Sequence, residues 1–121
     1  MSRSVYGLPL LAVLGGCNGI TCTDRPFPAL TVAPVDSATG APVDVNIEVI
    51  ATDGSFADTA RTLYSEPDHL RRAWLASERP GTYDVTVTAE GYVPWERSGV
   101  RVVSNTCGQP ETVDLIAQLQ R

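Results

Sequence analysis

The sequence contains no lysine, a single histidine and no apolar run long enough to cross a bilayer. All nine basic residues are arginines, and fourteen acidic residues outnumber them, so the formal net charge is −5. A chain without a basic face has little affinity for phosphate backbones or anionic headgroups, which argues against nucleic acid as a partner and against electrostatic adhesion to lipid. The apolar run over residues 8–14 is interrupted by Pro9 and falls far short of the ~20 residues of a membrane-spanning helix.

Groups that could carry a reaction are scarce. The only histidine, His69, follows Asp68 in a polar segment, but a catalytic triad also needs a nucleophile within reach of the base. Nothing around Ser65 or Ser77 marks either serine as activated. We therefore expect His69 to be a solvated loop side chain, and we expect no enzymatic activity and no cofactor.

Metal binding is not expected either. Asp36, Asp53 and Asp58 stand singly near turns, whereas a calcium loop supplies several oxygen ligands at close spacing. The preferred interpretation is turn chemistry, in which an aspartate carboxylate accepts hydrogen bonds from nearby backbone amides. The three cysteines fit no C-x-x-C spacing, so neither a zinc site nor a dithiol redox motif is indicated.

The N-terminal segment ends in Leu14-Gly15-Gly16-Cys17, directly after the apolar run. An apolar stretch followed by small residues is typical of a secretory signal at its cleavage site. With its cysteine, the segment resembles the lipobox of bacterial lipoproteins. The resemblance implies that residues 1–16 are a signal peptide and that Cys17 becomes the first residue, anchored in a membrane by fatty acyl chains such as palmitate; two or more chains anchor stably. A plain secretory signal, or a leader that happens to contain a cysteine, is the alternative.

Two cysteines remain once Cys17 is assigned to lipid. In the oxidising compartment that the lipobox implies, we expect Cys22 and Cys107 to form a disulfide between the start of the domain and its last strand. Residues 17–28 include two prolines and are expected to be a tether, and residues 29–121 to form one domain. A domain of roughly 90 residues buries a limited core, so such a covalent link matters to its stability.

The domain is expected to consist of short strands and turns. Val43, Val45, Ile47, Val49 and Ala51 alternate with polar residues, as do Tyr83, Val85, Val87 and Ala89, which is typical of half-buried strands. A hairpin turn is expected at Asp53-Gly54 and a type II turn at Arg79-Pro80-Gly81-Thr82. Further strands are expected near residues 30–32, 55–64, 73–76, 93–103 and 112–119, with a loop over 64–72. Seven short strands predict an all-β, antiparallel β-sandwich.

Three motifs carry a family resemblance. Residues 35–43 (VDSATGAPV), 80–87 (PGTYDVTV) and 90–92 (EGY) resemble the carboxypeptidase regulatory-like domain. The resemblance covers residues 29–119 and implies a transthyretin-like (prealbumin-like), seven-stranded Greek-key sandwich, with Tyr83 and Tyr92 at the margin of the core. In carboxypeptidases this module accompanies the catalytic domain and does not carry the catalysis.

We therefore expect a non-enzymatic binding or structural module, lipid-anchored in a bacterial cell envelope and facing the periplasm or the exterior, with another envelope protein as its partner. Both the inner and the outer membrane are possible sites of its attachment. The alternative is a carbohydrate-binding module in which Trp95 and Tyr92 form the stacking platform, because Pro94 indicates a strand edge or bulge beside them. Otherwise both tryptophans, Trp74 and Trp95, are expected to fill the core or cover a sheet end.

Overall fold

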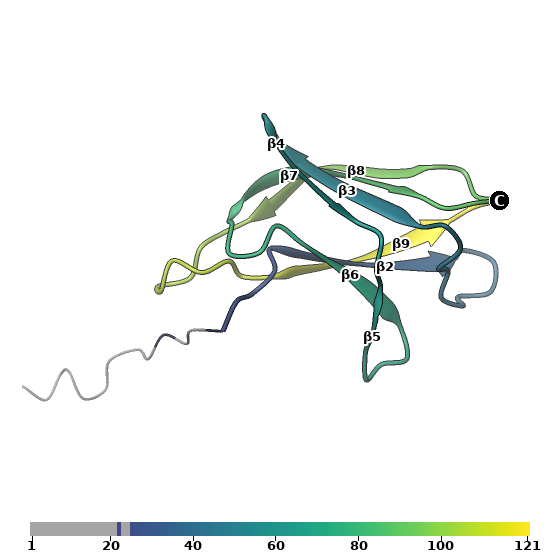
Figure 1. Ribbon diagram of the computed structural model, residues 1–121, viewed down its shortest axis with the longest axis horizontal. Coiled ribbons are helices and arrows are strands. Elements are labelled where there is room, and N and C mark those ends of the chain that lie inside the picture. Colours follow the sequence, from purple (N-terminus) through teal and green to yellow (C-terminus); the bar gives the residue numbers. More distant parts are fainter. Residues whose placement is uncertain (1–21, 23–24) are drawn as a thin grey trace, which may run out of the picture.

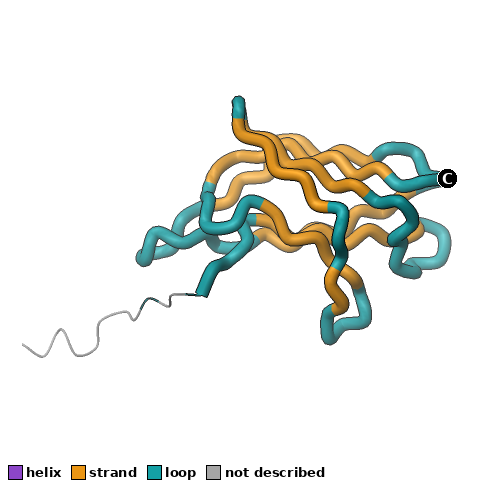
Figure 2. Tube along the Cα trace, in the orientation of Figure 1, coloured by secondary structure: helices purple, strands orange, loops and turns teal. Residues whose placement is uncertain are grey.

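The computed structural model describes Cys22 and residues 25–121, and this part of the chain is all-β without a helix. Its strands form two four-stranded sheets that lie face to face as a sandwich (Figures 1 and 2). The first sheet has the order β5-β6-β2-β9, and the second has the order β4-β3-β7-β8. The strands are β2 (Leu30–Asp36), β3 (Glu48–Asp53), β4 (Phe56–Ala60), β5 (Tyr64–Ser65), β6 (Arg71–Leu75), β7 (Gly81–Thr88), β8 (Trp95–Val102) and β9 (Val113–Leu119).

Strand number and direction differ from the expectation in two respects. The described residues form eight strands instead of seven, because the expected loop over 64–72 contains β5 and the beginning of β6. All strand pairs are antiparallel except β2 and β9, which run parallel from Leu30↔Val113 to Asp36↔Leu119. The expectation of a wholly antiparallel sandwich is therefore wrong for this pair, since alternation along a strand reveals its faces and not the direction of its neighbour.

The core lies between the two sheets and follows the alternation that the sequence shows. In β7 the side chains of Tyr83, Val85 and Val87 are buried, as predicted. The prediction for residues 43–51 holds except at Val45, which is 49% exposed. Asn46 has a φ of +44°, so the backbone leaves the extended conformation there and β3 begins only at Glu48.

Of the two predicted turns, one is confirmed and the other is wrong. Gly54 has a φ of +61° in the tight hairpin between β3 and β4, as expected. A type II turn needs a positive φ at Gly81, but Gly81 lacks one and begins β7. The chain turns earlier instead: Ala76 and Glu78 have positive φ angles, and the Arg79 amide donates to the Ala76 carbonyl at 3.2 Å.

The Cys22–Cys107 disulfide is present, with the two Cα atoms 5.7 Å apart. Cys107 lies in the loop between β8 and β9, so the bond joins the chain ahead of β2 to the loop ahead of β9, and not to the last strand itself. Figure 1 shows that the described chain enters β2 at one end of the sandwich and that the C-terminus lies at the other end. Cys17 and the signal assigned to residues 1–16 lie outside the described residues. No helix of sufficient length and hydrophobicity to cross a membrane occurs in the part that the structure describes.

Candidate functional site

Two large aromatic side chains are exposed on the outer face of the first sheet, the face turned away from the second sheet. Trp74 in β6 is 49% exposed and Tyr64 in β5 is 54% exposed. Their ring centroids lie 6.1 Å apart with an interplanar angle of 63°, an edge-to-face contact. Trp74 therefore does not fill the core, which was one of the two positions expected of it.

Strand parity explains why Trp74 points outward. Its neighbours Ala73 and Leu75 take the inward positions of β6 and are buried, which leaves Trp74 on the same side as Arg72. The segment 73–76 is apolar at every position, so its composition did not reveal the face. Arg71 and Arg72 put one arginine on each face, so the residues ahead of the segment did not reveal it either.

A hollow lies beside Trp74, over strands β2 and β9. Thr31 of β2 pairs laterally with Trp74 on one side and with Asp114 of β9 on the other, which places the three side chains in one row across the sheet. The hollow has a volume of about 530 Å³, and its wall also includes Pro28, residues 66–68, Arg72 and Thr112. Strand pairing thus gathers an aromatic ring, a hydroxyl and a carboxylate from three distant parts of the sequence.

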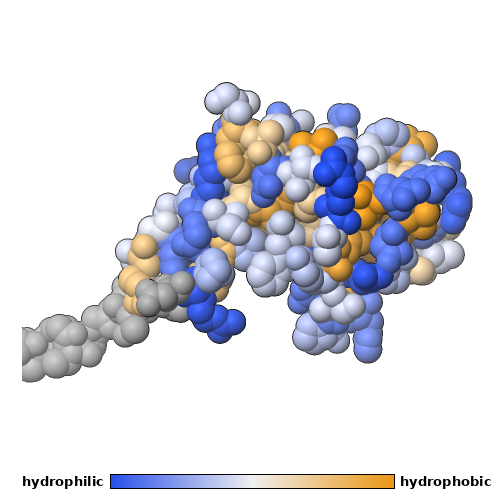
Figure 3. Space-filling view, viewed as in Figure 1, coloured by the Kyte–Doolittle hydropathy of each residue, from blue (hydrophilic) through white to orange (hydrophobic). Residues whose placement is uncertain are grey.

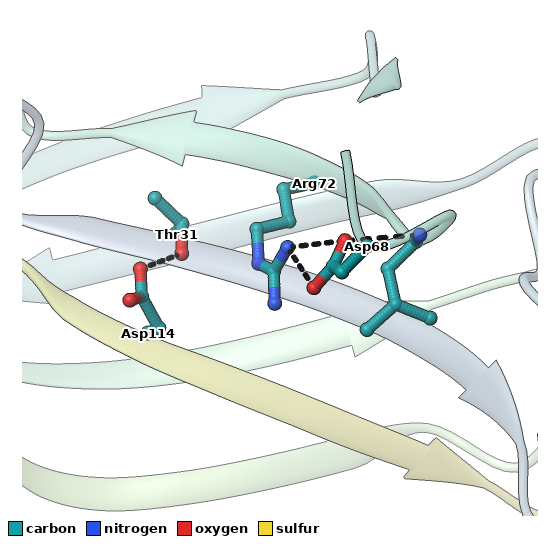
Figure 4. A network of polar contacts seen from close by, with 5 residues as sticks. Thr31, Asp68, Arg72 and Asp114 are labelled. Atoms are coloured by element: carbon teal, nitrogen blue, oxygen red, sulfur yellow. Dashed lines mark hydrogen bonds and ion pairs between the residues drawn. The ribbon is translucent and has the colours of Figure 1, made fainter. Parts of the chain in front are cut away.

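Polar contacts hold the side chains of this hollow in place (Figure 4). Arg72 Nη1 donates to both carboxylate oxygens of Asp68, at 2.9 and 3.1 Å. The hydrogen bond from Arg72, followed by that from the Leu70 amide at 3.1 Å, lowers the pKa of the Asp68 carboxyl below its ordinary value. The Thr31 hydroxyl donates to Asp114 Oδ1. Because these groups already bond to one another, the walls of the hollow are set before any ligand arrives.

A second hollow lies on the other side of the Trp74 ring. It is lined by Tyr64, Ser65, Glu66, Trp74 and Ser77, and its volume is about 550 Å³. Trp74 and Glu66 border both hollows. The tryptophan therefore forms a ridge between two adjacent depressions, each with hydroxyl or carboxylate groups in its wall.

The structure does not bring Tyr92 and Trp95 together as an open platform. Both are partly buried and pack against the core. The Tyr92 hydroxyl donates to Asp36 Oδ2 at 2.7 Å, and the Arg121 guanidinium lies 4.6 Å from the Tyr92 ring centroid. Arg97 lies 5.2 Å from the Trp95 ring centroid. The freely exposed aromatic surface of the described chain is at Tyr64 and Trp74 instead.

Asp36, Asp53 and Asp58 do not converge. Asp36 Oδ1 accepts from the amides of Ala38 and Thr39 in the turn after β2, which is the turn chemistry expected of it. Asp53 pairs with the Arg79 guanidinium at 3.0 Å, and Asp58 accepts from the Ala76 amide at 2.8 Å. Within Cys22 and residues 25–121, no three metal-ligating side chains form a group.

His69 is exposed in the loop before β6, and its backbone amide donates to the Glu66 carbonyl at 3.0 Å. Its φ of +70° belongs to the left-handed region that turns use. Ser65 and Ser77 are exposed and line the second hollow beside Trp74.

Figure 3 shows hydrophilic side chains over much of the face that is in view. No protein-family model matches the sequence, and no curated protein matches it either. The resemblance to the carboxypeptidase regulatory-like domain therefore stays a prediction that depends on three short motifs.

Proposed function

We propose that this chain is a non-enzymatic binding module, held on a bacterial envelope membrane by lipid on Cys17, that contacts its partner through the outer face of the first sheet. The observation that carries the proposal is the exposed pair Tyr64 and Trp74 beside two polar-walled hollows. Concave surfaces that combine aromatic rings with a few fixed polar groups are typical of binding sites. Large exposed aromatics are also the side chains that dominate binding energy at interfaces.

The disulfide supports a location outside the cytoplasm. Disulfides persist in oxidising compartments and are rare in the cytosol, so the Cys22–Cys107 bond agrees with export under the control of the N-terminal segment. The lipobox-like sequence Leu14-Gly15-Gly16-Cys17 then supplies the anchor. The module would face the periplasm or the exterior, close to the membrane that holds it.

We also propose that the sandwich is of the transthyretin-like Greek-key type. Seven strands remain when the two-residue β5 is set aside. The chain moves from the first sheet to the second with β3, returns with β6, leaves again with β7 and comes back with β9. This repeated exchange between sheets supports a Greek-key connection and separates the fold from a simple meander.

The test of the anchor is the intact mass of the protein purified from membranes, measured with and without reduction. We expect a species that begins at Cys17, is heavier by two or more acyl chains and gains two hydrogens on reduction. The matched control is Cys17→Ser, which should lose the added mass and leave the membrane fraction while keeping the disulfide. A wild-type species that begins at Met1 without acyl mass would overturn the proposal.

A further inference from the structure

We propose that the ligand of the outer face is a neutral glycan that lies across Trp74, with one sugar unit in each of the two hollows. The inference rests on the proposed function, because it names the ligand class of the same face. It uses a different pair of aromatic residues from the Trp95 and Tyr92 platform that the sequence suggested.

The shape of the site favours a ligand built of linked units. One hollow is lined by the row of Trp74, Thr31 and Asp114, and the other is lined by Trp74 and Tyr64. Both are open to solvent, and Trp74 and Glu66 border both of them. A ligand of one unit would fill one hollow and leave the other empty, whereas a chain of linked rings can pass over the ridge and occupy both.

The chemistry of the walls favours sugar over an apolar protein segment. The C–H face of a pyranose packs on an aromatic ring, whose face carries partial negative charge. Around Trp74 lie hydroxyl and carboxylate groups that can bond to sugar hydroxyls: Ser65 and Ser77 in one hollow, Asp114 in the other and Glu66 in both. An apolar segment would cover these groups without providing partners, and a buried unsatisfied polar group costs about 1–3 kcal/mol.

The charge of the site selects a neutral glycan. Among the described residues that line the two hollows, Arg72 is the one cation, and it is already engaged in two hydrogen bonds to Asp68. Glu66 and Asp114 therefore leave the hollows with an excess of negative charge. An anionic polysaccharide would be repelled, and the acidic balance of the whole chain acts in the same direction.

The inference can be tested by isothermal titration calorimetry, in which defined tetrasaccharides are added to the full chain in detergent. The neutral probes are the tetramers of β-1,4-linked glucose, α-1,4-linked glucose and β-1,4-linked N-acetylglucosamine, and the anionic probe is tetragalacturonate. We expect at least one neutral probe to bind and the anionic probe not to bind. Trp74→Ala should weaken binding by about tenfold or more, since aromatic anchors dominate such sites, and Trp74→Phe should keep most of the affinity.

Ile116→Ala is the matched control. Ile116 is 47% exposed in β9 on the same outer face, one row from Asp114, and lines neither hollow. This variant should bind the glycan as the wild type does. Urea unfolding should show that Trp74→Ala and Ile116→Ala keep the stability of the wild type.

Two results would overturn the glycan inference. The first is the absence of binding to every neutral probe. The second is that Trp74→Ala and Ile116→Ala lower the yield of a protein cross-linked to the chain in cells to the same extent. That result would indicate that a protein docks over the whole outer face of the sheet. Neither result bears on the proposed lipid anchor. An intact mass without acyl chains on Cys17 would refute the anchor, whether or not the protein binds glycan.

Discussion

Removal of the Cys22–Cys107 bond should destabilise the domain substantially, and its structure sets the size of the effect. The two cysteines are 85 residues apart in sequence, so the bond closes almost the entire domain into one loop. In the chain-entropy model, closing a loop of this length lowers the entropy of the unfolded chain and so raises its free energy by about 4.5 kcal/mol at 25 °C. That figure is an upper bound, because reduction also frees part of the folded chain.

Three hydrogen bonds hold the N-terminal end of the domain independently of the disulfide. The Phe27 amide donates to Glu78 Oε2 at 2.6 Å, the Glu78 amide donates to the Phe27 carbonyl at 2.8 Å, and the Thr112 hydroxyl donates to the Pro28 carbonyl at 2.6 Å. These bonds hold the chain from Phe27 onward without the disulfide. The folded domain keeps these contacts when the disulfide is reduced, so we expect a net loss of about 2–4 kcal/mol.

Urea unfolding of Cys22→Ser, Cys107→Ser and the double variant measures the effect. All three should lose the same free energy of unfolding, because each removes the same bond. Their m-values should rise, since the unfolded chain is no longer held compact. The midpoint of thermal unfolding should fall by about 10 °C or more for a domain of this size. A loss below about 1 kcal/mol, or losses that add in the double variant, would refute the reasoning.

Two further predictions concern polar contacts at the ends of the sandwich. The Tyr92 hydroxyl is the main cause of the lowered pKa of Asp36, so the stability that this carboxylate contributes is present at neutral pH and lost as the pH falls below about 4. Tyr92→Phe should therefore lower stability at pH 7 and flatten the acid limb of urea unfolding; an acid limb as steep as that of the wild type would contradict this. A Cβ at Gly81 would lie 2.5 Å from Asp53 Oδ2 and disturb the Asp53–Arg79 ion pair, so Gly81→Ala should be worse tolerated in the wild type than in an Asp53→Ala background, by about 1 kcal/mol. Additive effects in that double-mutant cycle would count against the close approach.

The sequence predicted the faces of strands well where polar and apolar residues alternate. Residues 83–89 are the clearest example, because each inward position is apolar and each outward position is polar or charged. At Trp74 the rule gave no answer, since 73–76 is apolar throughout. At Val45 it gave a wrong answer, because the left-handed backbone at Asn46 interrupts the strand and local composition does not reveal that conformation.

The candidate site could not be assembled from the sequence. Thr31, Trp74 and Asp114 come from distant parts of the chain and meet only because β2 pairs with β6 on one side and with β9 on the other. Strand order and register depend on contacts across the whole sandwich, so no local pattern specifies this row. The disulfide was within reach of the sequence because only two cysteines remain after the lipobox cysteine is assigned.

The position of the disulfide also decides how the domain responds to tension. A pull on the chain ahead of Cys22 reaches the sandwich by two routes: directly into the start of β2, and through Cys107 into the loop that joins the end of β8 to the start of β9. Because β2 and β9 are parallel neighbours, the two routes draw both strands from the same end and in the same direction. Without the bond the pull would act on β2 alone and slide it past β6 and β9. The covalent link thus turns a shearing force within the sheet into a load that two strands share.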